Sequence, residues 1–92
     1  MPIVKLSAEA TADYQQAFDW YELQQPGVGD KFKACLLSML DIIARFPSAF
    51  PEIDPGTRKA VLTDYPFIVL YQTRRDAIYV TAVGHASREP LF

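Results

Sequence analysis

Residues 65–71 and 77–85 read YPFIVLY and AIYVTAVGH, and these two segments decide the fold of the chain. In an extended strand, Phe67, Val69 and Tyr71 would face one side of a sheet, and the two residues between them would face the other. Both sides are apolar, which is typical of a strand in the middle of a sheet. We therefore predict that the first segment is a central strand.

The second segment begins after a short connection at residues 75–76 and alternates in the same way. We expect one side of this strand to carry Ile78, Val80 and Ala82, and the other side to carry residues 79, 81 and 83. Two strands joined by such a short connection are predicted to pair with each other in antiparallel fashion.

Two amphipathic helices are predicted upstream of these strands. Ser7 is a plausible N-cap for a helix over about residues 8–24, whose apolar side chains recur at three- and four-residue spacing while its acids lie mostly elsewhere. Pro26-Gly27 ends this helix, and a second one is expected over about residues 29–46. The two should form a helical hairpin with an acidic exterior on its first helix.

The remaining elements complete an α+β fold. Residues 3–6 form a short apolar strand candidate, and the prolines of residues 47–55 predict a loop before the sheet resumes at Arg58. The order is β-α-α-β-β-β. We predict one domain, residues 1–92, in which the helical hairpin packs on one face of a mainly antiparallel four-stranded sheet that includes the N-terminal strand.

The composition limits the classes of function. Half of the 92 residues are apolar, and the formal charge is −2, which argues against broad attachment to nucleic acid. The charge is uneven, because residues 57–92 hold five bases and three acids while the rest hold four bases and eight acids. A local basic site on an acidic body therefore remains possible.

Several simple features suggest a small protein without cofactors. The sequence shows no apolar run long enough to span a bilayer and no leader for export, so we expect a cytoplasmic protein. Cys35 is the only cysteine, and its apolar surroundings favour a packing role. We find no phosphate-binding glycine loop and no Cys/His metal spacing, and we predict neither a metal nor a cofactor.

Short sequence elements distributed over nearly the whole chain occur in a specific order. They are the helical pattern of residues 8–21, QPGVG at 25–29, Phe46-Pro47, GTRK at 56–59, YPF at 65–67, His85, Arg88 and Pro90. In this order and spacing they resemble the RelE/ParE superfamily, also called plasmid-stabilisation proteins, which are toxins of type II toxin–antitoxin modules. The resemblance implies a small α+β fold and a cognate antitoxin that masks the toxin.

The resemblance leaves the target open. Members that resemble RelE cleave mRNA on the ribosome, whereas members that resemble ParE poison DNA gyrase and are not nucleases. Leu91-Phe92 stands where many relatives have a tryptophan after the proline, and Lys59, Arg74 and Arg75 are the only other cations of the sheet region. We therefore expect a ParE-like toxin. The alternatives are a RelE-like mRNA endonuclease, which alone would be an enzyme, and a decayed relative that only binds.

Arg58, His85 and Arg88 are the candidate catalytic residues. The guanidinium groups of Arg58 and Arg88 could hold the oxygens of an attacked phosphate, and His85 could transfer a proton near neutral pH. The alternative for Arg58 is an ion pair with Glu52 or Asp54, and His85 could be structural. Arg88 could instead pair with Glu89 or with an antitoxin carboxylate.

Other residues are candidates for contact with a partner. Lys59, Arg74 and Arg75 could contact the target or nucleic acid, and Tyr71 could stack on a base, although core packing is its alternative. Trp20 lies off the apolar stripe of the first helix, and an exposed tryptophan suits an interface. We expect the antitoxin to fold a C-terminal segment onto the toxin, and we expect this segment to be helical and partly basic, to match the acidic first helix.

Overall fold

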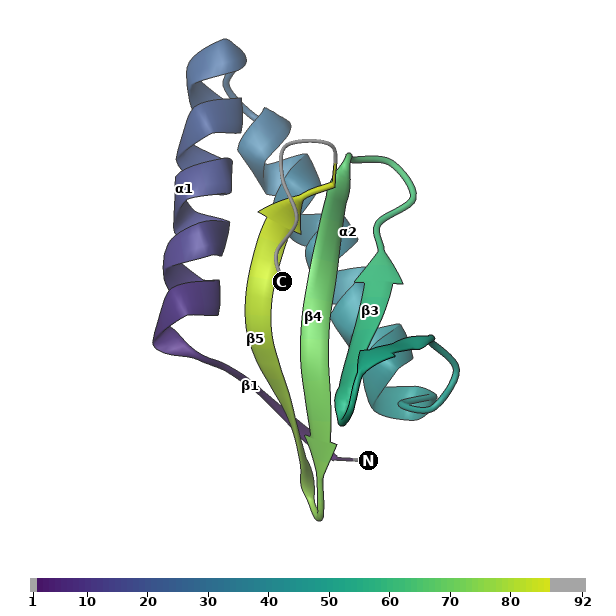
Figure 1. Cartoon of the computed structure of the whole chain (residues 1–92). Helices are drawn as coiled ribbons and strands as arrows, with labels where there is room; N and C mark the ends of the chain where they lie inside the picture. Colours follow the sequence, from purple (N-terminus) through teal and green to yellow (C-terminus); the bar gives the residue numbers. More distant parts are fainter. Residues whose placement is uncertain (1, 87–92) are drawn as a thin grey trace.

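The computed structural model describes residues 2–86 and contains a five-stranded sheet and two helices (Figure 1). The elements in chain order are β1 (Ile3–Leu6), α1 (Ala8–Gln24), α2 (Val28–Arg45), β2 (Glu52–Asp54), β3 (Thr57–Val61), β4 (Phe67–Arg74) and β5 (Ala77–His85). The order of strands in the sheet is β1-β5-β4-β3-β2, so β4 lies at its centre as predicted. The pair β1 and β5 is parallel, and all other pairs are antiparallel.

The predicted α+β fold is confirmed, but the sheet has five strands instead of four. The additional strand, β2, lies within the segment that its prolines had marked as a loop. It is a three-residue edge strand between Pro51 and Pro55. Proline is tolerated beside an edge strand because its missing N–H has no further strand to bond. Pro51 still contributes its carbonyl oxygen, which accepts a hydrogen bond from the Lys59 N–H at 3.0 Å.

Both helices begin and end close to their predicted bounds because local signals fix them. The Ser7 hydroxyl accepts the Ala10 N–H at 3.0 Å and caps α1. Gly27 adopts the left-handed conformation, with φ of 94°, between the two helices. The Glu22 carboxylate accepts the N–H groups of Gly27 and Gly29 at 3.1 and 2.6 Å, which satisfies donors at the start of α2. The hairpin turn is thus held by one carboxylate.

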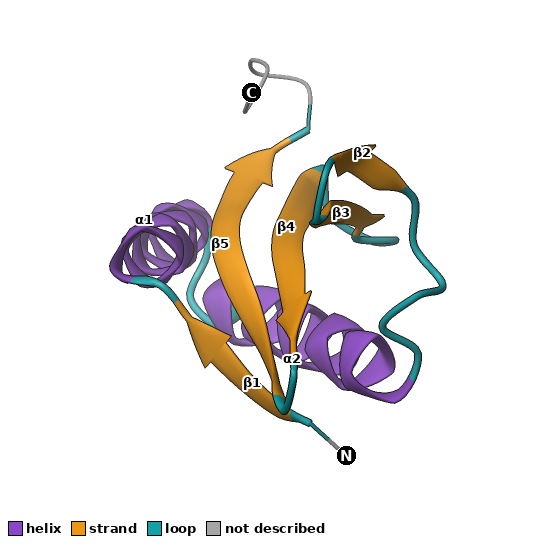
Figure 2. Ribbon diagram, turned by 60° about the horizontal axis from the view of Figure 1, so that its bottom comes forward, coloured by secondary structure: helices purple, strands orange, loops and turns teal. Residues whose placement is uncertain are grey.

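The helices pack on one face of the sheet (Figure 2). Phe32 of α2 is fully buried, and its ring lies 5.1 Å from that of Phe67 on β4 and 5.3 Å from that of Tyr21 on α1, measured between centroids. This aromatic cluster joins both helices to the central strand. Cys35 is half-buried and packs against the same core, in agreement with its predicted packing role.

A bulge in β5 changes the alternation predicted for its second half. Tyr71 pairs with Val80 but Leu70 pairs with Ala82, so Thr81 is the extra residue. Beyond the bulge the sides exchange, and Val83 enters the core, with 3% of its surface exposed. The prediction that Ala82 faces the same side as Val80 was therefore wrong.

The opposite face of the sheet carries no helix within residues 2–86, and it is the face turned to the viewer in Figure 1. We call it the open face, and β1, β3, β4 and β5 all contribute side chains to it. Within the part of the chain that the structure describes, neither helix is long and apolar enough to cross a membrane.

Candidate functional site

Arg58 holds the loop that follows α2. Its side chain lies on the helix-covered face of β3, where Nη1 donates to the carbonyl oxygens of Phe50 at 2.6 Å and Ser48 at 3.4 Å. The predicted alternative partner Glu52 instead accepts the Gly56 N–H at 3.1 Å. In this structure the guanidinium thus binds backbone oxygens of its own chain.

His85 lies at the far end of β5 from Arg58. It pairs with Phe67, and the two rings meet edge to face with centroids 5.2 Å apart. Arg58 pairs with Tyr71, four residues further along β4, which corresponds to roughly 13 Å along the strand. Two strand spacings add about 10 Å across the sheet, so the backbones of Arg58 and His85 are roughly 16 Å apart.

The predicted catalytic group is therefore not assembled among the residues that the structure describes. Its third member, Arg88, lies outside the described residues. Arg58 has bonded partners beside the middle of β4, and His85 packs on Phe67 at the first residue of β4.

Tyr71 is buried and is not available for stacking on a base. None of its surface is exposed, and its hydroxyl donates to the Pro47 carbonyl oxygen at 2.7 Å. Burial raises the pKa of the Tyr71 phenol, and the positive charge of Arg58 opposes this effect in part. The predicted contact role of Tyr71 does not fit this position, and the alternative of core packing does.

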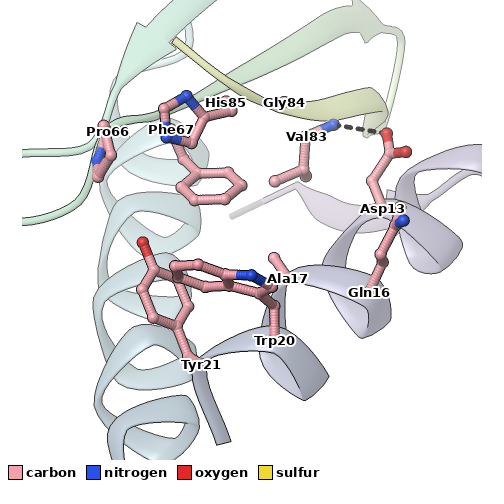
Figure 3. Close-up of a pocket in the computed structure, with 10 residues that line it drawn as sticks. All are labelled: Asp13, Gln16, Ala17, Trp20, Tyr21, Pro66, Phe67, Val83, Gly84 and His85. Atoms are coloured by element: carbon pink, nitrogen blue, oxygen red, sulfur yellow. Dashed lines mark hydrogen bonds between the residues drawn. The ribbon is translucent and has the colours of Figure 1, made fainter. Parts of the chain in front are cut away.

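A pocket of about 460 Å³ lies between α1 and the last residues of β5 (Figure 3). Its apolar walls include Trp20, Phe67 and Val83, and Asp13 and Gln16 lie at its polar side. Trp20 is 54% exposed and contacts Tyr21 edge to face, with centroids 5.1 Å apart. Its position off the buried stripe agrees with the sequence-based expectation.

The pocket exists because β1 is shorter than β5. β1 pairs with β5 only from Ala77 to Val80, and beyond that point α1 takes its place beside the strand. The Ser7 hydroxyl donates to the Thr81 carbonyl oxygen at 3.2 Å. The Asp13 carboxylate accepts the Val83 N–H at 3.1 Å, the bond that Figure 3 marks with a dashed line. Side chains of the helix thus satisfy backbone groups at an edge that would otherwise invite another strand.

The pocket and the exposed surface of α1 form what we call the acidic side of the molecule. The charged residues of α1 are four acids, Glu9, Asp13, Asp19 and Glu22, and the helix has no lysine or arginine. Leu23, one turn beyond Trp20, is 84% exposed. A partner that covers this side would meet apolar side chains surrounded by negative charge.

The open face of the sheet has the opposite charge. Lys5, Tyr79, Gln72 and Thr57 occupy equivalent positions on four adjacent strands and form one polar row. The Lys5 Nζ lies 5.8 Å from the centre of the Tyr79 ring, and the Arg74 guanidinium lies 5.0 Å from it on the ring's face. Lys59 pairs with Leu70 on the same face of the sheet.

The positions of the other predicted contact residues follow from this arrangement. Lys59 and Arg74 belong to the open face, whereas Arg75 is exposed in the turn between β4 and β5. Asp13, Lys5 and the polar row that contains Lys5 were not predicted as site features. Their spacing in the sequence carries no such signal, because only the register of the strands brings Lys5 beside Tyr79.

Comparison with known proteins gives a family and a fold. The family model of the ParE toxin of the type II toxin–antitoxin system parDE matches residues 4–90. A comparison with curated protein sequences finds no significant match.

Three solved structures share the fold at low sequence identity. One is the chromosomal ParDE system from P. aeruginosa, with a TM-score of 0.83, 19% identity, and coverage of 95% of this chain and 98% of that one. The isolated E. coli RelE toxin gives a TM-score of 0.71 and 17% identity, with 99% and 90% covered. The intact E. coli RelBE toxin–antitoxin complex gives 0.72 and 16%, with 96% and 100% covered.

Proposed function

The chain belongs to the family of ParE toxins of type II toxin–antitoxin systems, and from this premise we propose that it inhibits a macromolecular target, such as DNA gyrase, by binding to it. A cognate antitoxin neutralises it. The protein would act in the cytoplasm, where gyrase works. Inhibition by binding requires a complementary surface and no catalytic group.

The separation of Arg58 from His85 is the observation that carries this proposal. Phosphodiester cleavage needs a proton-transfer group and a cationic group at the same phosphate. Here the pairing register puts the two roughly 16 Å apart, and the Arg58 guanidinium is bound to the Phe50 carbonyl oxygen at 2.6 Å. This arrangement supports a binding toxin over a nuclease.

The test compares purified wild-type chain with the His85→Ala variant in two assays. We expect both proteins to inhibit DNA supercoiling by purified gyrase equally, and neither to cleave mRNA on purified ribosomes. Unchanged supercoiling at a stoichiometric excess of toxin would exclude gyrase as the target. Cleavage of mRNA by the wild type and not by His85→Ala would establish the RelE-like alternative. A chain that does not arrest growth when expressed alone would instead be the decayed relative.

We assign antitoxin binding to the acidic side. A segment with apolar anchors for the pocket beside Trp20 and with Lys or Arg for the acids of α1 would be complementary in shape and charge. Because the anchor would lie at the centre of the interface and the charges at its rim, Trp20 is expected to contribute most of the affinity.

Replacement of Trp20 tests this assignment. The Trp20→Lys variant introduces a positive charge and removes the ring, so we expect it to arrest growth but to escape rescue by the antitoxin gene expected beside this one. Leu37→Lys is the matched control, because Leu37 is 53% exposed on α2 and should be rescued like the wild type. Equal rescue of both variants would place the antitoxin on another surface.

A further inference from the structure

We propose that the open face of the sheet is the surface that binds the target, and that it recognises a protein segment bearing carboxylates next to apolar side chains. The inference rests on the proposed function and adds to it the site and the chemistry of the partner. It is carried by the arrangement of Lys5, Arg74 and Lys59 around Tyr79 and Gln72.

Two of the three cations of the open face, Arg74 and Lys5, contact neighbours that leave their charge in place. Arg74 lies over Tyr79, and its Nη2 donates to the Gln72 Oε1 at 3.1 Å, while the Gln72 Nε2 donates to the Thr57 hydroxyl at 3.2 Å. Lys5 approaches the same ring from β1. These contacts orient the side chains and neutralise no charge. Binding of an anion therefore costs less side-chain conformational entropy.

The charge of this face selects an acidic partner. On β1, β3, β4 and β5 the residues whose side chains face this side include three cations and no acid. The edge strand β2 adds one acid, Asp54, opposite Thr57. A net positive face on a chain of charge −2 favours a carboxylate-bearing segment through attraction that is local to this surface.

Two further observations favour a protein segment over nucleic acid. Stacking of a base on Tyr79 would displace a cation that already lies over the ring. Large apolar side chains are exposed at both ends of the face, with Ile3 62% exposed on β1 and Val61 51% exposed on β3. Apolar contacts at these ends and ionic contacts between them suit an acidic amphipathic segment.

The test removes two charges from the open face and, in a matched control, two from α2. The face variant is Lys5→Gln/Arg74→Gln. The control is Lys31→Gln/Lys33→Gln, since both lysines are exposed on α2 and the change in net charge is the same. Circular dichroism and thermal melting establish that both variants are folded. Toxicity is measured as growth arrest after induction without antitoxin.

Direct binding uses two fluorescent probes, a 12-residue peptide of alternating Glu and Leu and a 12-nucleotide single-stranded RNA. We expect the wild type and the control to bind the peptide, the face variant to bind it about tenfold more weakly, and RNA not to compete. The face variant should also lose growth arrest while the control keeps it.

The outcomes separate this inference from the proposed function. If the wild type does not arrest growth, the proposed function fails, and peptide binding still decides whether the face recognises acidic segments. If the face variant arrests growth and binds the peptide like the control, the inference alone is overturned. Tighter binding of RNA than of peptide, lost in the face variant, would overturn it in favour of a nucleic-acid surface.

Discussion

The acidic side and the open face both include residues of β5, and they are built in different ways. On the acidic side, the α1 helix replaces a strand and leaves a pocket of about 460 Å³ with an exposed tryptophan. On the open face, the register of four strands assembles cations around one tyrosine. Opposite charges on the two surfaces mean that partners of opposite charge can recognise the same small protein. Neutralisation and toxicity should therefore respond to different substitutions.

The largest expected effect comes from the core residue on which both surfaces depend. Phe32→Ala removes a fully buried ring that contacts α1 and β4, and we expect it to lower the free energy of unfolding by about 3–5 kcal/mol. Both binding activities should fall together. Urea denaturation measures the change, and Leu37→Ala, at an exposed site on the same helix, should change stability by less than about 0.5 kcal/mol. If Phe32→Ala abolished antitoxin binding and left target binding intact, or the reverse, the two surfaces would not depend on the same core residue.

Arg58 and Lys59 are neighbours in the sequence and point to opposite faces of the sheet. Substituting each in turn therefore separates effects on stability from effects on target binding. Arg58→Ala removes the bonds to the loop carbonyls of Ser48 and Phe50 and should cost about 1–2 kcal/mol of stability. Lys59→Ala should change stability by less than about 0.5 kcal/mol while weakening the target interaction.

Chemical denaturation and growth-arrest assays on the two variants measure these effects. A stable Arg58→Ala protein that has lost all toxicity would indicate that Arg58 has a direct role in toxicity.

A smaller effect is expected for the carboxylate that occupies the edge of β5. Asp13→Asn keeps an oxygen that can accept the Val83 N–H but removes the charge, so we expect a loss of about 0.5–1 kcal/mol in stability. Binding of a basic antitoxin should weaken as well, while target binding stays unchanged. Asp19→Asn removes an equal charge from α1 without touching β5. Equal stability of the two variants, measured by thermal melting, would show that the edge bond contributes little.

The ionisation of Tyr71 is expected to have no effect on the free energy of unfolding at neutral pH and to matter only in alkaline solution. Burial raises its pKa above the ordinary value of 10.0, so the folded state holds this proton more tightly than the unfolded state. The resulting stability is present below pH 10 and is lost as the pH rises through the higher pKa of the folded protein. Unfolding followed between pH 9 and 12 should show this loss, and Tyr71→Phe should reduce it. Burial also raises the pKa values of Tyr14 and Tyr21, so these groups should contribute to the loss in the same direction.

The helices and the central strand could be predicted because their signals are local. Ser7, Pro26-Gly27 and the apolar run of β4 fix positions within a few residues of themselves. β2 was missed because an edge strand does not need every N–H, so its flanking prolines do not exclude it. The bulge at Thr81 was missed because alternation along one strand says nothing about its partner's register.

The candidate site was harder to predict for the same reason. Arg58 was identified as a candidate from its residue type, but its function in the fold depends on which side of β3 it faces and on the loop that lies there. Lys5 and Tyr79 are 74 positions apart in the sequence and are neighbours only through the parallel pair of β1 and β5. Trp20 was recognisable because its deviation from the helical stripe is a local property.

The parallel pairing of β1 with β5 also affects when the sheet can form during synthesis. The first strand of the sheet pairs with the last, and the Ser7 hydroxyl bonds to Thr81 across 74 residues of chain. During synthesis, β1 leaves the ribosome early and has no partner until β5 follows, because such distant contacts form only after the intervening chain exists. The polar row around Tyr79 therefore forms only after β5 has been synthesised. A nascent chain therefore cannot present the proposed target-binding surface until β5 has been made.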